Sequence, residues 1–204
     1  MPLIYQSEIK NKAVVGVWHI QEPISFFLEQ LNENQVPDEK LESRKFEKLG
    51  TSYLLNVLAK RSIHHTVVYD TFGKPFLEDS ADSVSFSHKK NHVAVMLAND
   101  KLLPGIDIET VCNLPVKLAP KFVSDNDIIP DGILTVDQKF TLIWAAKESL
   151  YKVYGRKELD FRKNMSVHFK SPNQLVGFVE KDAVTMQLQL RYEFINNLVL
   201  VHTL

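Results

Sequence analysis

Residues 104–110, PGIDIET, place two carboxylates on one side of an expected β-strand. Successive side chains of a strand point to opposite faces, so the two isoleucines share one face and Asp107 and Glu109 share the other. Neighbouring carboxylates repel each other. They are tolerated where water solvates a strand edge, or where a cation lies between them. The segment by itself leaves both interpretations open.

A third carboxylate lies in the segment 144–155, WAAKESLYKVYG. Trp144, Glu148 and Lys152 are four residues apart, so on a helix they share one face. The simplest interpretation is an exposed Glu–Lys pair, worth about 0.3–0.5 kcal/mol. If this helix lies beside the strand with the two acids, three carboxylates meet, and such a cluster needs a cation. Ligands that are all oxygen suit Mg²⁺.

Other polar residues are weaker candidates when taken singly. His88 follows an expected strand in SFSHKKNH, and Lys74 lies in the turn FGKPF; residues in such places are usually solvated. His64 and His65 are adjacent and diverge on a strand, so we interpret them as structural or exposed. Cys112, the single cysteine, is expected to be a small packed side chain. A lone cysteine excludes an internal disulfide and fits a reducing compartment.

Composition limits the class of protein. The chain has 204 residues, 45% hydrophobic and 24% charged, as in an ordinary globular protein with one large domain or two small ones. A formal net charge of -1 gives no indication of nucleic-acid binding. The N-terminal residues lack a signal-peptide pattern, and the apolar run 13–18 is too short to span a bilayer. We therefore expect a cytoplasmic protein with no membrane partner. No glycine-rich phosphate loop, zinc-type spacing or nucleophile elbow is present.

Hydrophobic periodicity predicts the elements that position the candidate residues. Their order, mixed strands and helices followed by an antiparallel meander, predicts an α+β fold rather than a doubly wound parallel sheet. The best boundary within the chain is the segment 98–105. A capping box formed by Thr135 and Gln138 opens the helix that carries Glu148, and Gly155 closes it. The predicted helices are 22–31, 38–62, 114–124 and 136–154, and the predicted strands are 13–20, 65–70, 83–87, 92–98, 105–109, 165–170, 175–180, 184–194 and 198–204.

Four motifs occur in a specific order: GKP at 73–75, SFSH at 85–88, GIDIE at 105–109, and WAAKES at 144–149 with Lys152 behind it. In this order and at these intervals, over nearly the whole chain, they resemble the 4′-phosphopantetheinyl transferases. The most similar subgroup is the monomeric two-lobed type that activates carrier domains of peptide and polyketide synthases.

The resemblance implies two similar α+β lobes related by a pseudo-two-fold axis, with the active site between them. We expect an N-terminal lobe, residues 1–102, that contacts coenzyme A, and a C-terminal lobe, residues 103–204, with the metal-binding acids. With both lobes in one chain, a monomer is sufficient.

The resemblance also implies a reaction, that of a holo-[acyl-carrier-protein] synthase. The 4′-phosphopantetheine group of coenzyme A is transferred to a serine of an apo acyl or peptidyl carrier protein, with Mg²⁺, and 3′,5′-adenosine bisphosphate is released. The sequence does not name the carrier; residues 111–136 are the candidate docking region. One alternative is a non-catalytic relative that binds coenzyme A or a carrier protein. Another is an unrelated interaction protein whose acids are surface charges.

The resemblance gives individual residues their roles. Asp107, Glu109 and Glu148 match the metal-binding acids, and Glu148 also matches the position of a base for the serine proton; sequence leaves ligand and base open. The expected catalytic residues are thus Glu148, Lys152 and His88, and the expected coenzyme A contacts are Lys74, His88, Lys147 and Lys152.

The chain departs from the family pattern at three positions. At one of them Lys89 follows the SH pair, where a small residue is common, and it could add a phosphate contact. Ser52 stands where the first long helix often carries an arginine that contacts a coenzyme A phosphate. Arg44, Lys48 or Arg61 are possible substitutes. Asp127 stands where a glutamate is common, which we expect to be tolerated.

Overall fold

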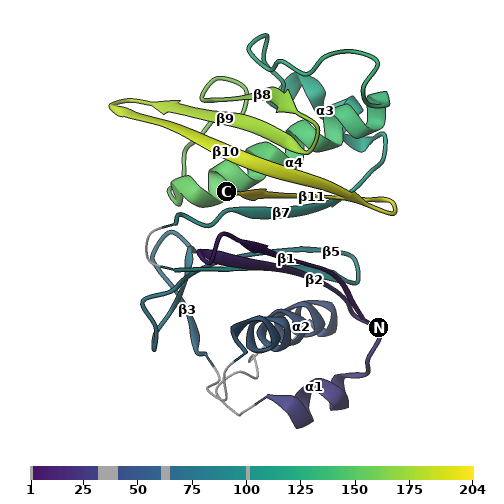
Figure 1. The fold of residues 1–204 in the computed structure, drawn as a ribbon, viewed down its shortest axis with the longest axis vertical. Helices are drawn as coiled ribbons and strands as arrows, with labels where there is room; N and C mark the ends of the chain where they lie inside the picture. The colour runs from purple at the N-terminus through teal and green to yellow at the C-terminus, as the bar shows by residue number, and fades with distance from the viewer. Residues whose placement is uncertain (1, 32–40, 61–64, 100–101) are drawn as a thin grey trace. The chain divides into compact units, whose positions relative to one another are not determined.

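The computed structural model describes residues 2–31, 41–60, 65–99 and 102–204 (Figure 1). The chain divides into two compact units, Met1–Pro104 and Gly105–Leu204. Each unit is described by itself, and the assignment of coenzyme A contacts to one and metal-binding acids to the other stays a prediction. Arg61 and His64, together with both ends of the predicted helix 38–62, lie outside the described residues.

The first unit contains a four-stranded antiparallel sheet in the order β1-β2-β6-β5. Its long helix α2 carries fully buried leucines at 49, 54 and 55, spaced so that one face of the helix packs on strands β2 and β6. The shorter helix α1 packs against α2. The elements of this unit are β1 Leu3–Ile9, β2 Ala13–His19, α1 Ile24–Gln30, α2 Glu42–Ala59, β3 Val67–Tyr69, β4 Pro75–Leu77, β5 Ser83–Lys89 and β6 His92–Ala98.

Two strands of the first unit were not predicted from sequence, β1 and β4. Strand β4 pairs with β3 around a tight turn. In this turn the Asp70 carboxylate accepts hydrogen bonds from the backbone N–H groups of Phe72 and Lys74, and Gly73 has a φ of 88°. Strand β5 also extends further than predicted, through His88 to Lys89, so His88 is a strand residue rather than part of the turn.

The second unit contains a five-stranded antiparallel sheet in the order β7-β11-β10-β9-β8 (Figure 1). Helix α4 packs on this sheet and helix α3 packs against α4. Together with the first unit, this arrangement confirms the predicted α+β class. The elements are β7 Ile106–Thr110, α3 Leu114–Phe122, α4 Val136–Tyr154, β8 Met165–Ser171, β9 Gln174–Lys181, β10 Val184–Ile195 and β11 Leu198–Thr203.

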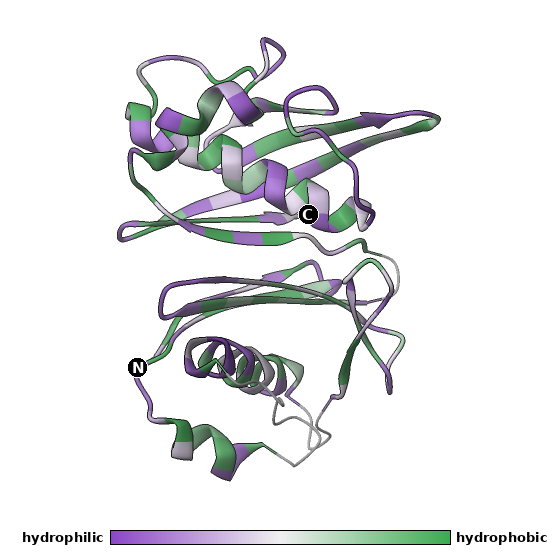
Figure 2. Ribbon diagram, turned by 180° about the vertical axis from the view of Figure 1, so that it is seen from behind, coloured by the Kyte–Doolittle hydropathy of each residue, from purple (hydrophilic) through white to green (hydrophobic). Residues whose placement is uncertain are grey.

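Helix α4 has the bounds that the sequence predicts. Thr135 and Gln138 form both hydrogen bonds of the capping box, and Gly155 ends the helix in the left-handed conformation with a φ of 67°. In Figure 2, hydrophobic and hydrophilic segments alternate along the sheets and helices, as expected of elements with one buried face. Within the described residues, the structure has no helix with the length and apolar character that a membrane crossing needs.

Gly105 lets α4 approach the start of β7 closely. A Cβ atom at this position would collide with the Ser149 carbonyl oxygen and lie 2.6 Å from Cγ2 of Val153. Its backbone N–H donates to the Thr203 hydroxyl at 3.2 Å. The first residue of GIDIE is therefore a glycine because helix backbone occupies the place of a side chain.

Candidate active site

The acids of β7 lie on the face of the strand that meets α4. Gly105 faces α4, and side chains two and four residues further along a strand share its face. These are Asp107, which is 5% exposed, and the half-buried Glu109. Ile106 and Ile108 alternate with them and are fully buried.

Lys152 of α4 joins the helix to the strand. Its Nζ donates to Asp107 Oδ1 at 2.7 Å and to the carbonyl oxygen of Ile106 at 2.8 Å. These bonds use two of the three donors of the ammonium group, and the side chain is 26% exposed. The lysine therefore bonds an acid on the neighbouring strand.

Glu148 lies close enough to both strand acids to respond to their charge. Burial, together with the negative charges of Asp107 and Glu109, raises the pKa of Glu148 to about 7, although Lys152 opposes the shift. The structure thus brings together the three carboxylates and the lysine that the sequence singled out. A pKa near neutrality lets Glu148 both accept and release a proton at physiological pH.

Trp144, one turn before Glu148, holds the second strand acid. Its indole Nε1 donates to Glu109 Oε1 at 3.2 Å. The indole ring packs against the rings of Phe122 and Phe161, with ring centroids 5.1 and 5.3 Å away. Sequence spacing placed Trp144 on the right helix face but gave no signal that it binds Glu109, because the two residues are 35 positions apart.

The three carboxylates fit a divalent cation by chemistry and charge. All their donor atoms are oxygens, which Mg²⁺ prefers, and their mutual repulsion is what a cation would relieve. In this structure two of the carboxylates are hydrogen-bonded to other side chains: Lys152 donates to Asp107, and Trp144 donates to Glu109. Among the described residues, no three Asp, Glu, His or Cys side chains form a ready-made metal cluster.

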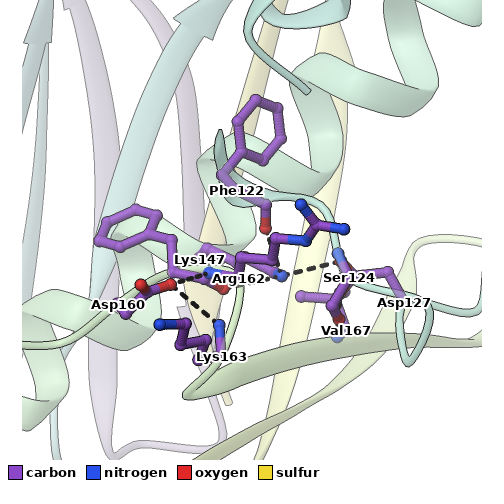
Figure 3. Close-up of polar contacts among 9 residues, drawn as sticks. Phe122, Ser124, Asp127, Lys147, Asp160, Arg162, Lys163 and Val167 are labelled. Carbon is purple, nitrogen blue, oxygen red and sulfur yellow. Dashed lines mark hydrogen bonds and ion pairs between the residues drawn. The ribbon is translucent and has the colours of Figure 1, made fainter. Parts of the chain in front are cut away.

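Lys147 is buried inside the second unit, contrary to our expectation. We expected it to contact coenzyme A, but its side chain is 0% exposed and its Nζ donates to three acceptors inside the second unit (Figure 3). The acceptors are the Asp127 carboxylate and the carbonyl oxygens of Phe122 and Phe161. Three bonds use all the donors of an ammonium group, so none remains for a phosphate. Burial lowers the pKa of Lys147, and the bond to Asp127 opposes this shift.

His88 and Lys74 lie in the first unit. His88 Nε2 is 3.2 Å from Glu47 Oε2 of α2, and the histidine side chain is 59% exposed. Lys74 lines a cavity of about 270 Å³ together with Asp70 and Phe76. Sequence reasoning missed Glu47 as the partner of His88, since no local spacing relates two residues on different elements. The predicted coenzyme A contacts of both residues stay predictions.

The helix on which we expected Ser52 is α2. Ser52 is half-buried on it, and Arg44 and Lys48 are exposed on the same helix. Whether either of them takes the place of the expected arginine stays a prediction.

Two comparisons with known proteins found matches to this chain. Residues 104–195 match the family model of the 4′-phosphopantetheinyl transferase superfamily. A curated relative, the 4′-phosphopantetheinyl transferase Gsp of Aneurinibacillus migulanus, is 28% identical over 113 residues. The alignment covers 54% of this chain and 46% of the relative, so the chain spans about half the length of the relative that it matches.

These findings confirm the predicted resemblance to the 4′-phosphopantetheinyl transferase superfamily. The matched segment contains the three carboxylates and Lys152, the residues that the structure brings together on β7 and α4.

Proposed function

We propose that this protein is a 4′-phosphopantetheinyl transferase. It moves the 4′-phosphopantetheine group of coenzyme A to a serine hydroxyl of an apo acyl or peptidyl carrier protein and releases 3′,5′-adenosine bisphosphate. The observation that carries the proposal is the convergence of Asp107, Glu109 and Glu148 beside Lys152, within the segment that matches the superfamily.

Three carboxylates and a lysine suit a reaction at a pyrophosphate. Coenzyme A carries a pyrophosphate whose negative charge repels an incoming hydroxyl. Asp107, Glu109 and Glu148 would hold Mg²⁺, which supplies charge neutralisation and polarises the phosphoryl group when bound. Lys152 adds a positive charge next to Asp107, in a position to stabilise charge that develops on the phosphate oxygens.

Glu148 is also the candidate base. With a pKa of about 7, a large share of Glu148 is ionised at neutral pH and able to accept the serine proton. The roles of ligand and base compete, because a bound cation favours the ionised form and lowers the basicity of the carboxylate.

The first unit contributes the predicted coenzyme A contacts. His88 is exposed on β5, and Lys74 lines the cavity beside the β3–β4 turn. Histidine and lysine side chains of this kind can donate hydrogen bonds to the phosphates of coenzyme A. Cytoplasmic location and a monomeric state belong to the same proposal.

An intact-mass assay tests the function. The purified protein is mixed with coenzyme A, Mg²⁺ and a panel of apo carrier proteins, and EDTA replaces Mg²⁺ in the control. A phosphopantetheine adduct on a carrier that disappears with EDTA is the expected result. Glu148→Gln should remove the adduct, whereas Glu180→Gln, an exposed acid on β9, should leave it.

The same assay separates the transferase from a non-catalytic relative. The serine at position 52 is the feature that favours the relative, because an arginine is common at this position in the family. Measurable coenzyme A binding without an adduct on any carrier would support the non-catalytic relative and overturn the transferase.

A further inference from the structure

A buried ion pair lies next to the candidate active site but takes no part in it. Lys147 Nζ and Asp127 Oδ2 are 2.8 Å apart, and their side chains are 0% and 1% exposed (Figure 3). Replacing such a pair with apolar residues of similar volume is often neutral or stabilising. Stability alone therefore does not explain why this lysine is charged and buried.

Asp127 fixes the loop after α3. Its Oδ2 accepts the backbone N–H of Ser124 at 2.8 Å, and its Oδ1 accepts the backbone N–H of Val167 at 2.9 Å. One carboxylate thus ties the loop to strand β8 and presents a fixed acceptor to Lys147. Charge-assisted bonds of this kind are shorter and stronger than neutral ones.

Lys147 bonds the backbones of two residues whose rings contact Trp144. Its Nζ donates to the carbonyl oxygen of Phe122 at 2.7 Å and to that of Phe161 at 3.0 Å. The aromatic rings of these same two residues contact Trp144, whose Nε1 donates to the Glu109 carboxylate. A continuous series of contacts therefore runs from the buried pair to a candidate metal ligand.

The loop that carries Phe161 is itself preorganised. The Asp160 carboxylate accepts the backbone N–H groups of Arg162 and Lys163 at 2.9 and 3.0 Å. Arg162 in turn donates to the carbonyl oxygen of Pro120 in α3 at 3.1 Å. These bonds direct the Phe161 carbonyl at Lys147, and the bond from Lys147 Nζ then links this turn to helix α4.

We propose that the Asp127–Lys147 pair is a positioning device for Glu109. By fixing the backbones of Phe122 and Phe161 it fixes the plane of Trp144, and the indole N–H then sets the direction of the Glu109 carboxylate. Lys147 and Asp127 are positioning residues, since neither touches the reacting groups. The metal-binding part of this inference rests on the proposed function, whereas the link from Lys147 to Trp144 does not.

The indole resonance of Trp144 provides a direct readout. The chain has two tryptophans, Trp18 and Trp144, so the indole region of a ¹H–¹⁵N spectrum holds two signals that Trp18→Phe assigns. Glu109→Gln replaces the charged acceptor with a neutral one, so the Trp144 signal should move upfield. This displacement defines the signature of a lost indole–carboxylate bond.

The test variant replaces both members of the pair, Lys147→Met with Asp127→Leu. It leaves no unpaired buried charge, but it removes the acceptor of the Ser124 and Val167 N–H groups, so it should unfold cooperatively at a lower temperature than the wild type. We expect its Trp144 signal to move in the same direction as in Glu109→Gln. Lys139→Met is the matched control, since it removes a lysine of the same helix that pairs at the surface with Asp131, and it should leave the signal in place.

A wild-type Trp144 signal in the folded double variant would overturn the proposal, because the indole would then keep its position without the pair. The second readout is the Kd for Mg²⁺ by calorimetry on the full chain. Loss of the positioning pair should raise this Kd about tenfold or more, the usual effect of removing the support of a metal ligand. If the wild-type protein binds no Mg²⁺, the proposed function fails, but the resonance comparison still decides the link between Lys147 and Trp144.

Discussion

Glu148 should destabilise the metal-free protein at neutral and alkaline pH. Its folded-state pKa of about 7 lies above the ordinary value of 4.5, so the folded state binds the proton more tightly than the unfolded chain. Stability therefore falls as the pH rises from about 4.5 to 7, and the full cost is present above pH 7. The cost is absent below about pH 4, where both states are protonated.

The magnitude follows from the size of the shift. The difference between the ordinary pKa of 4.5 and the folded-state pKa of about 7 corresponds to roughly 3 kcal/mol. Glu148 is only half-buried and solvent screens part of the repulsion, so we expect about 1–2 kcal/mol. For a chain of this size, that is a difference in melting temperature of roughly 2–8 °C.

The assay compares Glu148→Gln with the wild-type protein by thermal unfolding in EDTA. The variant should be the more stable protein at pH 8, and the difference should vanish near pH 4. With millimolar Mg²⁺ the order should reverse, because ligand binding stabilises the folded wild type and the variant has lost a ligand. Glu180→Gln serves as the control for loss of one surface charge.

One result would refute the reasoning. If Glu148→Gln is less stable than the wild type at pH 8 in EDTA, the carboxylate contributes to the fold and is not strained by Asp107 and Glu109. The candidate site would then be a set of structural contacts.

Three further predictions concern other positions. Gly105→Ala should lower stability by about 1–3 kcal/mol, because its new methyl group collides with the Ser149 carbonyl, and it should also slow transfer; a wild-type denaturation midpoint would contradict the close approach of α4. Asp107→Asn should shift the Mg²⁺ dependence of transfer to higher concentrations and weaken the bond from Lys152; an unchanged metal titration would remove Asp107 from the ligand set. Ser52→Arg should tighten coenzyme A binding several-fold by calorimetry, and an unchanged Kd would show that another cation already serves this position.

Local sequence rules predicted α4 and β7 well. The capping box and the terminal glycine set the bounds of α4, and the alternation in GIDIE set which side chains share a face of β7. Strands β1 and β4 were missed for physical reasons. Strand β4 has only three residues next to a turn, and β1 is an edge strand whose residues are mostly half-exposed, so neither gives a strong periodic signal.

The sequence by itself determined which residues share a face, because helix and strand periodicity are local properties. It placed Glu148 and Lys152 on one face of α4, and Asp107 and Glu109 on one face of β7. The tertiary structure alone decided which faces meet, since contacts between elements depend on packing across long stretches of chain.

Lys147 and Glu148 show this difference most clearly. They are adjacent in the sequence, and consecutive helix positions point about 100° apart. The packing of α3 and the Phe161 loop against α4 therefore buries Lys147 among carbonyl oxygens and Asp127. Glu148 instead lies near the two acids of β7. A pattern of charged residues shows that a lysine is available, but only its three-dimensional neighbours determine whether it binds a ligand or supports the fold.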